Sequence, residues 1–126
     1  MSSPLNYDGG LTISIQVSDF DRAIAWYRDV LGFSMLYRID DMQWAELATE
    51  TARVNIGLSA VEKPKVGAGP VPTFGVKDIA AARKRLEGQK VRFDGETQTI
   101  PGMVSLATFF DPDGNALMLF QDLQGK

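Results

Sequence analysis

Residues 17–33 read VSDFDRAIAWYRDVLGF, and a similar stretch, VKDIAAARKRLEGQKVRF, begins at Val76, an offset of 59 residues. The same offset separates the tripeptide Leu-Ala-Thr at residues 47–49 from its second occurrence at residues 106–108. An offset shared by independent matches favours duplication of one structural unit over coincidence. The chain is therefore predicted to fold as two copies of the same unit.

The first copy has the pattern of a strand, a helix and three further strands. Apolar and polar residues alternate over 11–17, which is typical of a half-buried strand. A helix follows, with Ser18 and Asp21 forming an S-x-x-D capping pattern at its start and Gly32 at its end. The remaining strands are predicted at residues 33–38, 43–49 and 53–59, so the unit is βαβββ.

The second copy repeats this order. PVPTFGV, residues 70–76, supplies its first strand, and its helix is predicted to be capped by Asp78 and to stop at Gly88. Three strands are predicted near residues 91–93, 103–110 and 115–121. The DPDG sequence at residues 111–114 favours a hairpin turn, because its proline presets a turn and its Asp-Gly pair tolerates a positive φ. It lacks the glycine and glutamate spacing of an EF-hand calcium loop.

Length and composition favour one compact domain. The chain has 126 residues, 44% of them hydrophobic and 23% charged, so residues 1–126 are predicted to form a single domain. Within it, residues 11–59 and 71–122 are the two predicted modules, joined by a Gly- and Pro-rich linker at residues 60–70. The net charge of -3, without a long basic run, predicts no nucleic-acid partner.

The absence of two residue types restricts the chemistry. The sequence contains no cysteine and no histidine, which excludes disulfides, a cysteine nucleophile, a Ser-His-Asp triad and histidine-based metal sites within the chain. No apolar run has the length of a membrane span, and the N-terminal residues lack the pattern of a secretion signal. A cytoplasmic protein that does not interact with membranes is expected.

The run at residues 17–33, together with FFDPDGNALMLFQ at residues 109–121, resembles the vicinal oxygen chelate superfamily. That superfamily includes glyoxalase I, bleomycin-resistance proteins and extradiol dioxygenases, and the resemblance extends from Leu11 to Asp122. It implies an α+β fold in which two βαβββ modules form a curved open barrel with the helices outside and a small-molecule ligand in the concavity. It also implies a homodimer, with Trp26 a candidate contact.

Metal-dependent relatives place their ligands at four positions, which the resemblance carries over to Thr12, Gly57, Val71 and Met118. A divalent ion needs three or more oxygen or nitrogen donors, and these four residues supply one hydroxyl. We therefore predict that the protein has no metal site and no cofactor.

Strand alternation predicts which side chains line the concavity. In the last strand, Leu117 and Leu119 are predicted to face the helices, and Met118 and Phe120 the cavity. The predicted ligand-binding set mixes aromatic, thioether and polar groups, as small-molecule pockets do, although some of its members would only fill the barrel. The set is Thr12, Ser14, Gln16, Trp44, Glu46, Arg53, Asn55, Met103, Ser105, Phe109, Met118 and Phe120.

Glu46 is the candidate catalytic residue. With a raised pKa it would act as a general base, and as a carboxylate it would bind a cationic ligand or pair with Arg53 on the neighbouring strand. The first functional interpretation is a metal-free protein that binds a small, largely apolar or cationic molecule, as the bleomycin-resistance branch does by sequestration. The alternative is a glyoxalase-like lyase or isomerase, metal-independent or with non-standard ligands.

Overall fold

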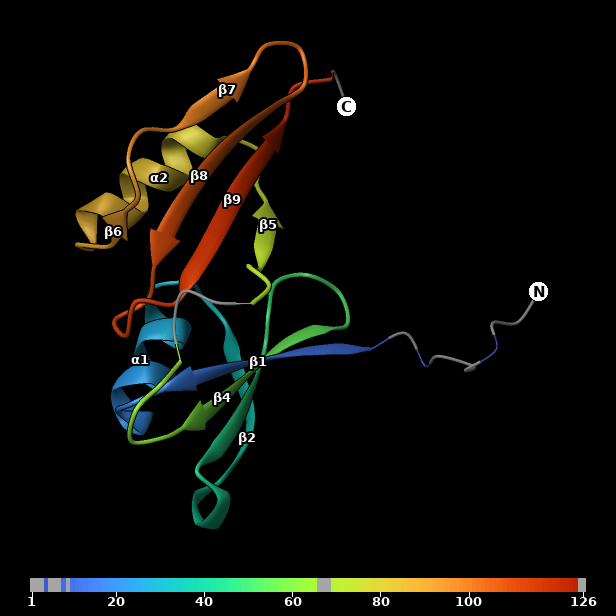
Figure 1. The fold of residues 1–126 in the computed structure, drawn as a ribbon. Coiled ribbons are helices and arrows are strands. Elements are labelled where there is room, and N and C mark those ends of the chain that lie inside the picture. Colours follow the sequence, from blue (N-terminus) through green and yellow to red (C-terminus); the bar gives the residue numbers. More distant parts are fainter. Residues whose placement is uncertain (1–3, 5–7, 9, 66–68, 125–126) are drawn as a thin grey trace. The chain divides into compact units, whose positions relative to one another are not determined.

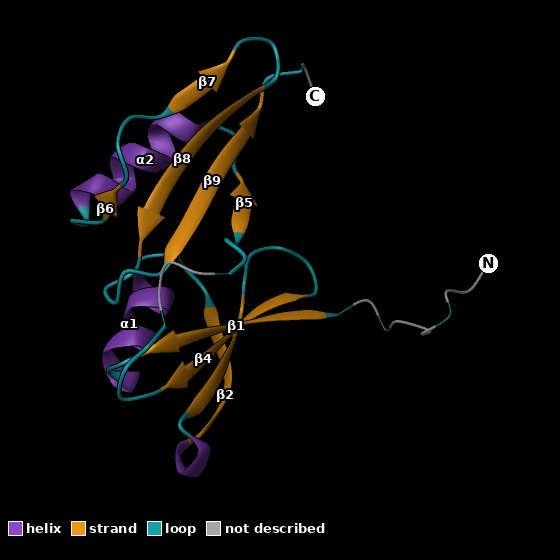
Figure 2. Cartoon of the chain, in the orientation of Figure 1, coloured by secondary structure: helices purple, strands orange, loops and turns teal. Residues whose placement is uncertain are grey.

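A computed structural model describes residues 4, 8, 10–65 and 69–124 (Figure 1). The chain separates into two compact units, residues 1–64 and 65–126. The boundary falls inside the predicted linker, of which residues 66–68 lie outside the described residues. In each unit an α-helix lies against one face of a β-sheet (Figure 2).

The first unit has the predicted βαβββ order. Its elements are β1 (Leu11–Val17), α1 (Phe20–Asp29), β2 (Ser34–Ile39), the 3-10 turn η1 (Asp40–Met42), β3 (Trp44–Ala48) and β4 (Val54–Ala60). The sheet order is β1-β4-β3-β2. Strands β1 and β4 are parallel, and the β2–β3 and β3–β4 pairs are antiparallel.

The second unit repeats this topology. Its elements are β5 (Thr73–Gly75), α2 (Ile79–Gly88), β6 (Arg92–Phe93), β7 (Gln98–Ile100), β8 (Val104–Phe110) and β9 (Ala116–Asp122). The sheet order is β5-β9-β8-β6, with β7 also paired to β8, so β6 and β7 together take the place that β2 has in the first unit. The α+β class and the duplicated module are confirmed, whereas β7 was not predicted.

Aspartates begin both helices. Asp78 caps α2 as predicted, because its Oδ1 accepts the backbone N–H of Ala81 at 3.1 Å. In α1 the predicted cap is one residue too early: Asp19, and not Ser18, is the N-cap, and its Oδ1 accepts the N–H of Arg22 at 3.1 Å. The carboxylate satisfies a backbone donor that has no partner within the helix.

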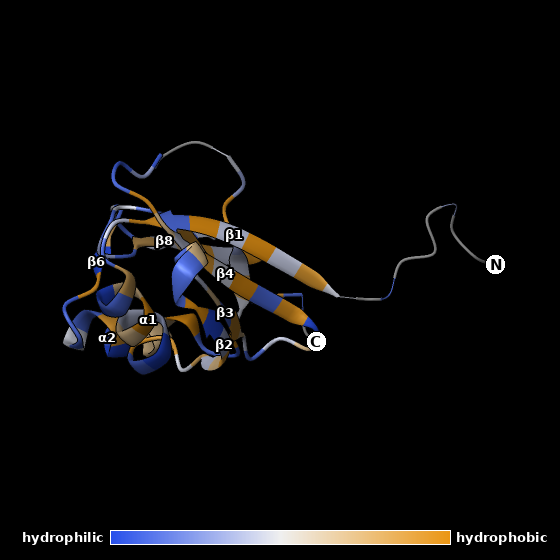
Figure 3. Cartoon of the chain, turned by 90° about the horizontal axis from the view of Figure 1, so that it is seen from below, coloured by the Kyte–Doolittle hydropathy of each residue, from blue (hydrophilic) through white to orange (hydrophobic). Residues whose placement is uncertain are grey.

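Each sheet buries one face against its own helix. Along β1 the hydropathy alternates residue by residue (Figure 3), and the inner side chains Ile15 and Val17 are buried. The core of the first unit consists mainly of Ile15, Val17, Phe20, Ala23, Ile24, Tyr27, Ala45, Leu47, Ile56 and Leu58. That of the second consists mainly of Ile79, Leu86, Val91, Ala107, Phe109, Leu117 and Leu119.

The DPDG sequence forms the predicted turn between β8 and β9. The buried Asp111 accepts the backbone N–H groups of Asp113 and Asn115 on Oδ1, at 2.9 and 2.8 Å. Its Oδ2 accepts the side-chain amide of Asn115 at 2.8 Å, and Gly114 supplies the positive φ of 96° that the turn requires. The carboxylate of Asp111 is thus a structural group of the hairpin.

Candidate functional site

The face of the first sheet that points away from α1 is polar and partly accessible, and we call it the open face. Register places Thr12 of β1 beside Asn55 of β4, and Glu46 of β3 beside Gly57 of β4. Strand alternation places further side chains on this same face, and none of these side chains is buried. The predicted members Thr12, Ser14, Gln16, Trp44, Glu46 and Asn55 all lie on this face.

Glu46 is the centre of a hydrogen-bond cluster on the open face. Its Oε2 accepts the hydroxyl of Thr12 at 2.8 Å and the side-chain amide of Asn55 at 2.9 Å. Its Oε1 accepts the hydroxyl of Tyr37 at 2.9 Å. Three strands therefore each present a neutral donor to one carboxylate on β3.

A β-bulge brings Tyr37 to this cluster. Met35 pairs with Leu47, but the next pair along is Tyr37 with Glu46, so Leu36 is an extra residue in β2. In a regular ladder Leu36 would stand opposite Glu46. Sequence reasoning missed Tyr37, because only this one-residue shift aligns its phenol with the carboxylate.

The environment lowers the pKa of Glu46 below its ordinary value of 4.5. The largest cause is the hydrogen bond from Asn55, followed by that from Thr12; burial opposes them, and the hydroxyl of Tyr37 and the indole of Trp44 lower the pKa further. Donors to the charged form favour ionisation. This shift is opposite to the raised pKa that a general base at Glu46 would need, and a catalytic role for Glu46 stays a prediction.

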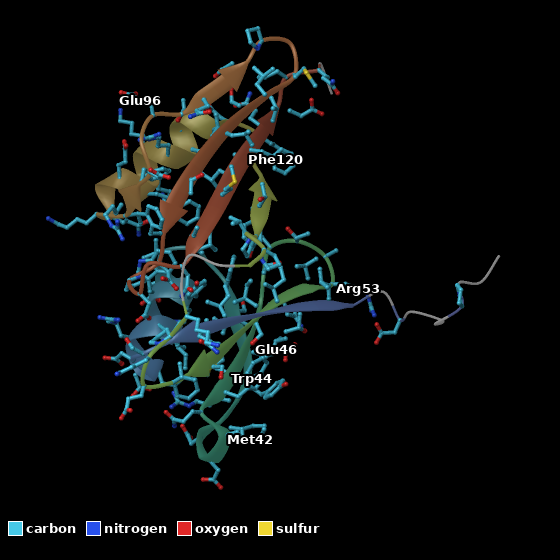
Figure 4. The ribbon with its side chains drawn as sticks, in the orientation of Figure 1. Met42, Trp44, Glu46, Arg53, Glu96 and Phe120 are labelled. Atoms are coloured by element: carbon cyan, nitrogen blue, oxygen red, sulfur yellow. The ribbon has the colours of Figure 1, made fainter. Side chains whose placement is uncertain are left out.

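Arg53 does not pair with Glu46. It precedes β4 with a left-handed backbone, φ 60°, and its guanidinium donates to the backbone carbonyl of Asp8 (Figure 4). The predicted cross-strand pair required Arg53 to lie inside the strand beside β3. The strand instead starts at Val54, so the alternative in which Arg53 pairs with Glu46 is excluded, and the prediction that Arg53 lies within this strand is wrong.

Trp44 lies on the open face together with Glu46 (Figure 4). Its indole is half-buried and covers Gly57, where a β-carbon would meet the ring at 2.1 Å. The indole N–H donates to the hydroxyl oxygen of Tyr37 at 3.4 Å. The polar groups of Trp44 and Tyr37 therefore both belong to the hydrogen-bond cluster around Glu46.

The residues at the family's metal positions do not fit a metal ion. The hydroxyl of Thr12 is engaged with Glu46, and Gly57 is covered by the indole of Trp44. In the second unit, the side chains of Val71 and Met118 have no oxygen or nitrogen. Among residues 4, 8, 10–65 and 69–124, no three His, Cys, Asp or Glu side chains are grouped closely enough to hold a metal.

In the second sheet the predicted faces of β9 are confirmed, whereas the predicted face of β8 is wrong. Leu117 and Leu119 are buried, while Met118 and Phe120 alternate with them and point to the opposite face, as predicted. The ring of Phe120 covers Gly75, where a β-carbon would meet it at 2.8 Å.

The prediction placed the wrong face of β8 in the cavity. Phe109 pairs with Leu117 and is fully buried, with its ring 5.6 Å from that of Phe93 on the helix side. Ser105 shares that face, is also buried, and bonds to Thr99 at 2.9 Å. Leu106 and Thr108 instead share the face of Met118 and Phe120.

Met103 was also misplaced. It lies in the turn before β8, where its side chain is 53% exposed, and it is not part of a strand wall. The predicted strand began at Met103, one residue before the observed start at Val104. The apolar side chain of Met103 gave no signal of a turn.

The topology repeats in both units, and a family model matches residues 11–119. The chain belongs to the Glyoxalase/Bleomycin resistance protein/Dioxygenase superfamily. This confirms the resemblance stated from the sequence.

Solved structures share the superfamily fold. A superfamily member from Sphaerobacter thermophilus DSM 20745 is 24% identical, with a TM-score of 0.77, over 90% of this chain and 96% of that chain. TnmS3, an antibiotic binding protein from Streptomyces sp. CB03234, is 27% identical, with a TM-score of 0.74, over 88% of this chain and 93% of that one.

A more distant likeness is to FosX, a genomically encoded fosfomycin resistance protein from Listeria monocytogenes, which shares the fold at 14% identity. Its TM-score is 0.74, and the match covers 87% of this chain and 89% of that chain. The search of curated proteins returned no match. Neither described helix has the length and apolar character that crossing a membrane would need.

Proposed function

We propose that this superfamily member is a metal-independent binding protein that sequesters a small, largely apolar or cationic molecule. The ligand contacts the open face of the first sheet, around Trp44 and Glu46. The observation that carries the proposal is an ionised carboxylate, held by three neutral donors, beside two aromatic side chains that are not buried. A few convergent polar groups among aromatic side chains are typical of small-molecule sites.

The comparisons support a binding role. TnmS3, at 27% identity, is described as an antibiotic binding protein, and this chain covers 93% of it. The metal-free part of the proposal is supported by the positions where metal-dependent relatives bind their ion, because Gly57 has no side-chain donor there and Thr12 supplies a single hydroxyl, whose hydrogen bonds to Glu46.

The alternative of a glyoxalase-like lyase or isomerase has less support. A general base works best when its pKa lies near the working pH, and the pKa of Glu46 is shifted in the opposite direction. A carboxylate that already accepts three hydrogen bonds is a weak base. No residue of the cluster therefore favours proton abstraction. The predicted homodimer and cytoplasmic location stay predictions.

The test is a ligand screen with a matched pair of tryptophan variants. Cationic antibiotics and aromatic metabolites would be screened by ligand-observed NMR against the wild type, Trp44→Ala and Trp26→Phe. Trp26 lies on α1, which packs against the opposite face of the first sheet, so its variant is the control. We expect hits whose affinity falls at least about tenfold in Trp44→Ala and stays unchanged in Trp26→Phe.

The following results would contradict the proposal. Hits that bind Trp44→Ala as tightly as the wild type would place the ligand elsewhere. One equivalent of zinc, nickel or iron in protein purified without chelators, or a rise in melting temperature on adding one of them, would overturn the metal-independent part. Consumption of a hit by the protein would support the enzymatic alternative instead.

A further inference from the structure

We infer that the group recognised by the open face is an N-methylated or quaternary ammonium, which contacts the rings of Trp44 and Tyr37 while Glu46 balances its charge. This inference rests on the proposed function and specifies the ligand class of the same site. It follows from the charge of the cluster, from the number of acceptor positions left on Glu46, and from the aromatic side chains beside it.

The charge of Glu46 has no basic partner within the described part of the chain. Its hydrogen-bond partners Thr12, Asn55 and Tyr37 are neutral. Arg53, the basic residue expected beside it, donates to a backbone carbonyl instead. The open face therefore carries an uncompensated negative charge, to which a positive ligand is complementary.

The acceptor positions on Glu46 decide the kind of cation. A carboxylate offers about four lone-pair positions, and three of them are occupied by Thr12, Asn55 and Tyr37. A guanidinium binds a carboxylate through two parallel bonds, and a primary ammonium has three N–H groups to satisfy. A quaternary ammonium has no N–H group, so it benefits from the charge without needing a further acceptor.

The aromatic side chains supply the remaining contact. Tyr37 is 46% exposed, and its hydroxyl is fixed between Glu46 and the indole N–H of Trp44. Because the Tyr37 hydroxyl and the Trp44 indole N–H already form hydrogen bonds, a ligand would contact the carbon atoms of the two rings. Ring faces attract cations, and tryptophan does so most strongly.

The inference is tested with three probes that share a benzyl group. Benzyltrimethylammonium, benzylammonium and benzyl alcohol would be titrated at pH 7 and low salt by isothermal calorimetry or protein NMR. We expect benzyltrimethylammonium to bind at least about tenfold more tightly than either of the others. Glu46→Gln keeps the shape of the side chain and removes its charge, so it should lower the affinity for benzyltrimethylammonium several-fold and leave benzyl alcohol unaffected.

Two substitutions of Tyr37 test the role of its ring. Tyr37→Phe keeps the ring and should keep most of the preference for benzyltrimethylammonium, whereas Tyr37→Leu removes the ring and should lower its affinity several-fold. Far-ultraviolet circular dichroism would confirm that each variant is folded. If Glu46→Gln failed to fold, the order of the three probes on the wild type would still decide the question.

Each other outcome overturns the inference in a distinct way. If benzylammonium bound most tightly, the site would recognise an N–H donor. If benzyl alcohol bound as tightly as benzyltrimethylammonium, the site would not recognise charge. In both cases the proposed function stands. If no probe bound but the screen gave hits that depend on Trp44, only the inference would fail. If the screen failed too, the proposed function would fail with it.

Discussion

The indole of Trp44 lies directly over Gly57, so a β-carbon on Gly57 would stand 2.1 Å from Cη2 of the ring and 2.4 Å from Cζ2. Real side chains do not approach so closely, and any residue larger than glycine must displace the ring. Gly57 is therefore required for the position of the indole that the proposed ligand contacts.

Replacing Gly57 by alanine should move Trp44 away from the sheet. Because the contact involves the far end of a half-buried side chain, we expect a moderate loss of stability, about 1–3 kcal/mol, with a clear change in indole fluorescence. A Trp26→Phe background would make Trp44 the sole tryptophan, since the chain has two.

The matched control for this substitution is Gly88→Ala. Gly88 ends α2, and a β-carbon there would meet nothing within 4 Å. We expect Gly88→Ala to leave the fluorescence unchanged and the stability equal or slightly higher. Equal effects of the two substitutions would contradict the close contact between Trp44 and Gly57.

Glutamate at two neighbouring positions of β9 should have opposite consequences for folding. Leu117 is fully buried on the helix side, so Leu117→Glu should cost about 3–5 kcal/mol or prevent folding. Met118 points to the other face and is half-buried, so water can reach a carboxylate there and Met118→Glu should cost under about 1.5 kcal/mol. Urea unfolding of both variants measures the difference, and similar losses would show that both faces are closed core.

The turn at Asp111 should depend on its carboxylate. Asp111→Ala leaves the backbone N–H groups of Asp113 and Asn115 without their acceptor, so we expect a loss of about 1–3 kcal/mol in the free energy of unfolding. Asp111→Asn keeps one acceptor oxygen and should fall between the alanine variant and the wild type. A stability of Asp111→Ala equal to that of the wild type would argue against this role.

The lowered pKa of Glu46 predicts the pH range in which its cluster stabilises the fold. A group with a depressed pKa binds fewer protons in the folded state than in the unfolded state. Its contribution is complete above its ordinary value of 4.5 and is lost as the pH falls through the lower folded-state pKa. The difference in unfolding free energy between the wild type and Glu46→Gln should therefore be largest near pH 6 and shrink towards pH 2.

The carboxyl carbon of Glu46 can be followed directly by NMR during the same acid titration. A midpoint above 4.5 would mean that the donors from Asn55, Thr12 and Tyr37 do not hold the charged form. Asn55→Ala is the informative variant, because Asn55 is the largest cause of the shift and its removal should raise the midpoint.

Alternation of apolar and polar residues is sufficient to predict the open face of the first sheet. In β1 the polar positions are unambiguous, so the pattern alone assigns Thr12 to the correct face. In β8 both faces are apolar near Phe109 and Phe110, and only the pairing of Phe109 with Leu117 shows which of them is buried.

The site itself was predicted only in part, for a related reason. The neighbour of Glu46 on β2 depends on an extra residue at Leu36, and a bulge leaves no mark in the hydrophobic pattern. Arg53 was misplaced because its left-handed backbone ends the turn before β4, and arginine gives no sequence signal for that conformation.

The break between β6 and β7 has a consequence for self-association in the folded state. A long uninterrupted outer strand leaves a row of unpaired backbone groups on which another chain can extend the sheet. In the second unit this border is divided into two short strands, and Arg83 bonds to Gly95 and Thr97 in the gap between them. In the first unit the corresponding border is continuous, but the bulge at Leu36 interrupts its regular spacing. Equivalent borders of the two copies are thus irregular for different reasons, one because of a gap in the strand and the other because of an extra residue within it.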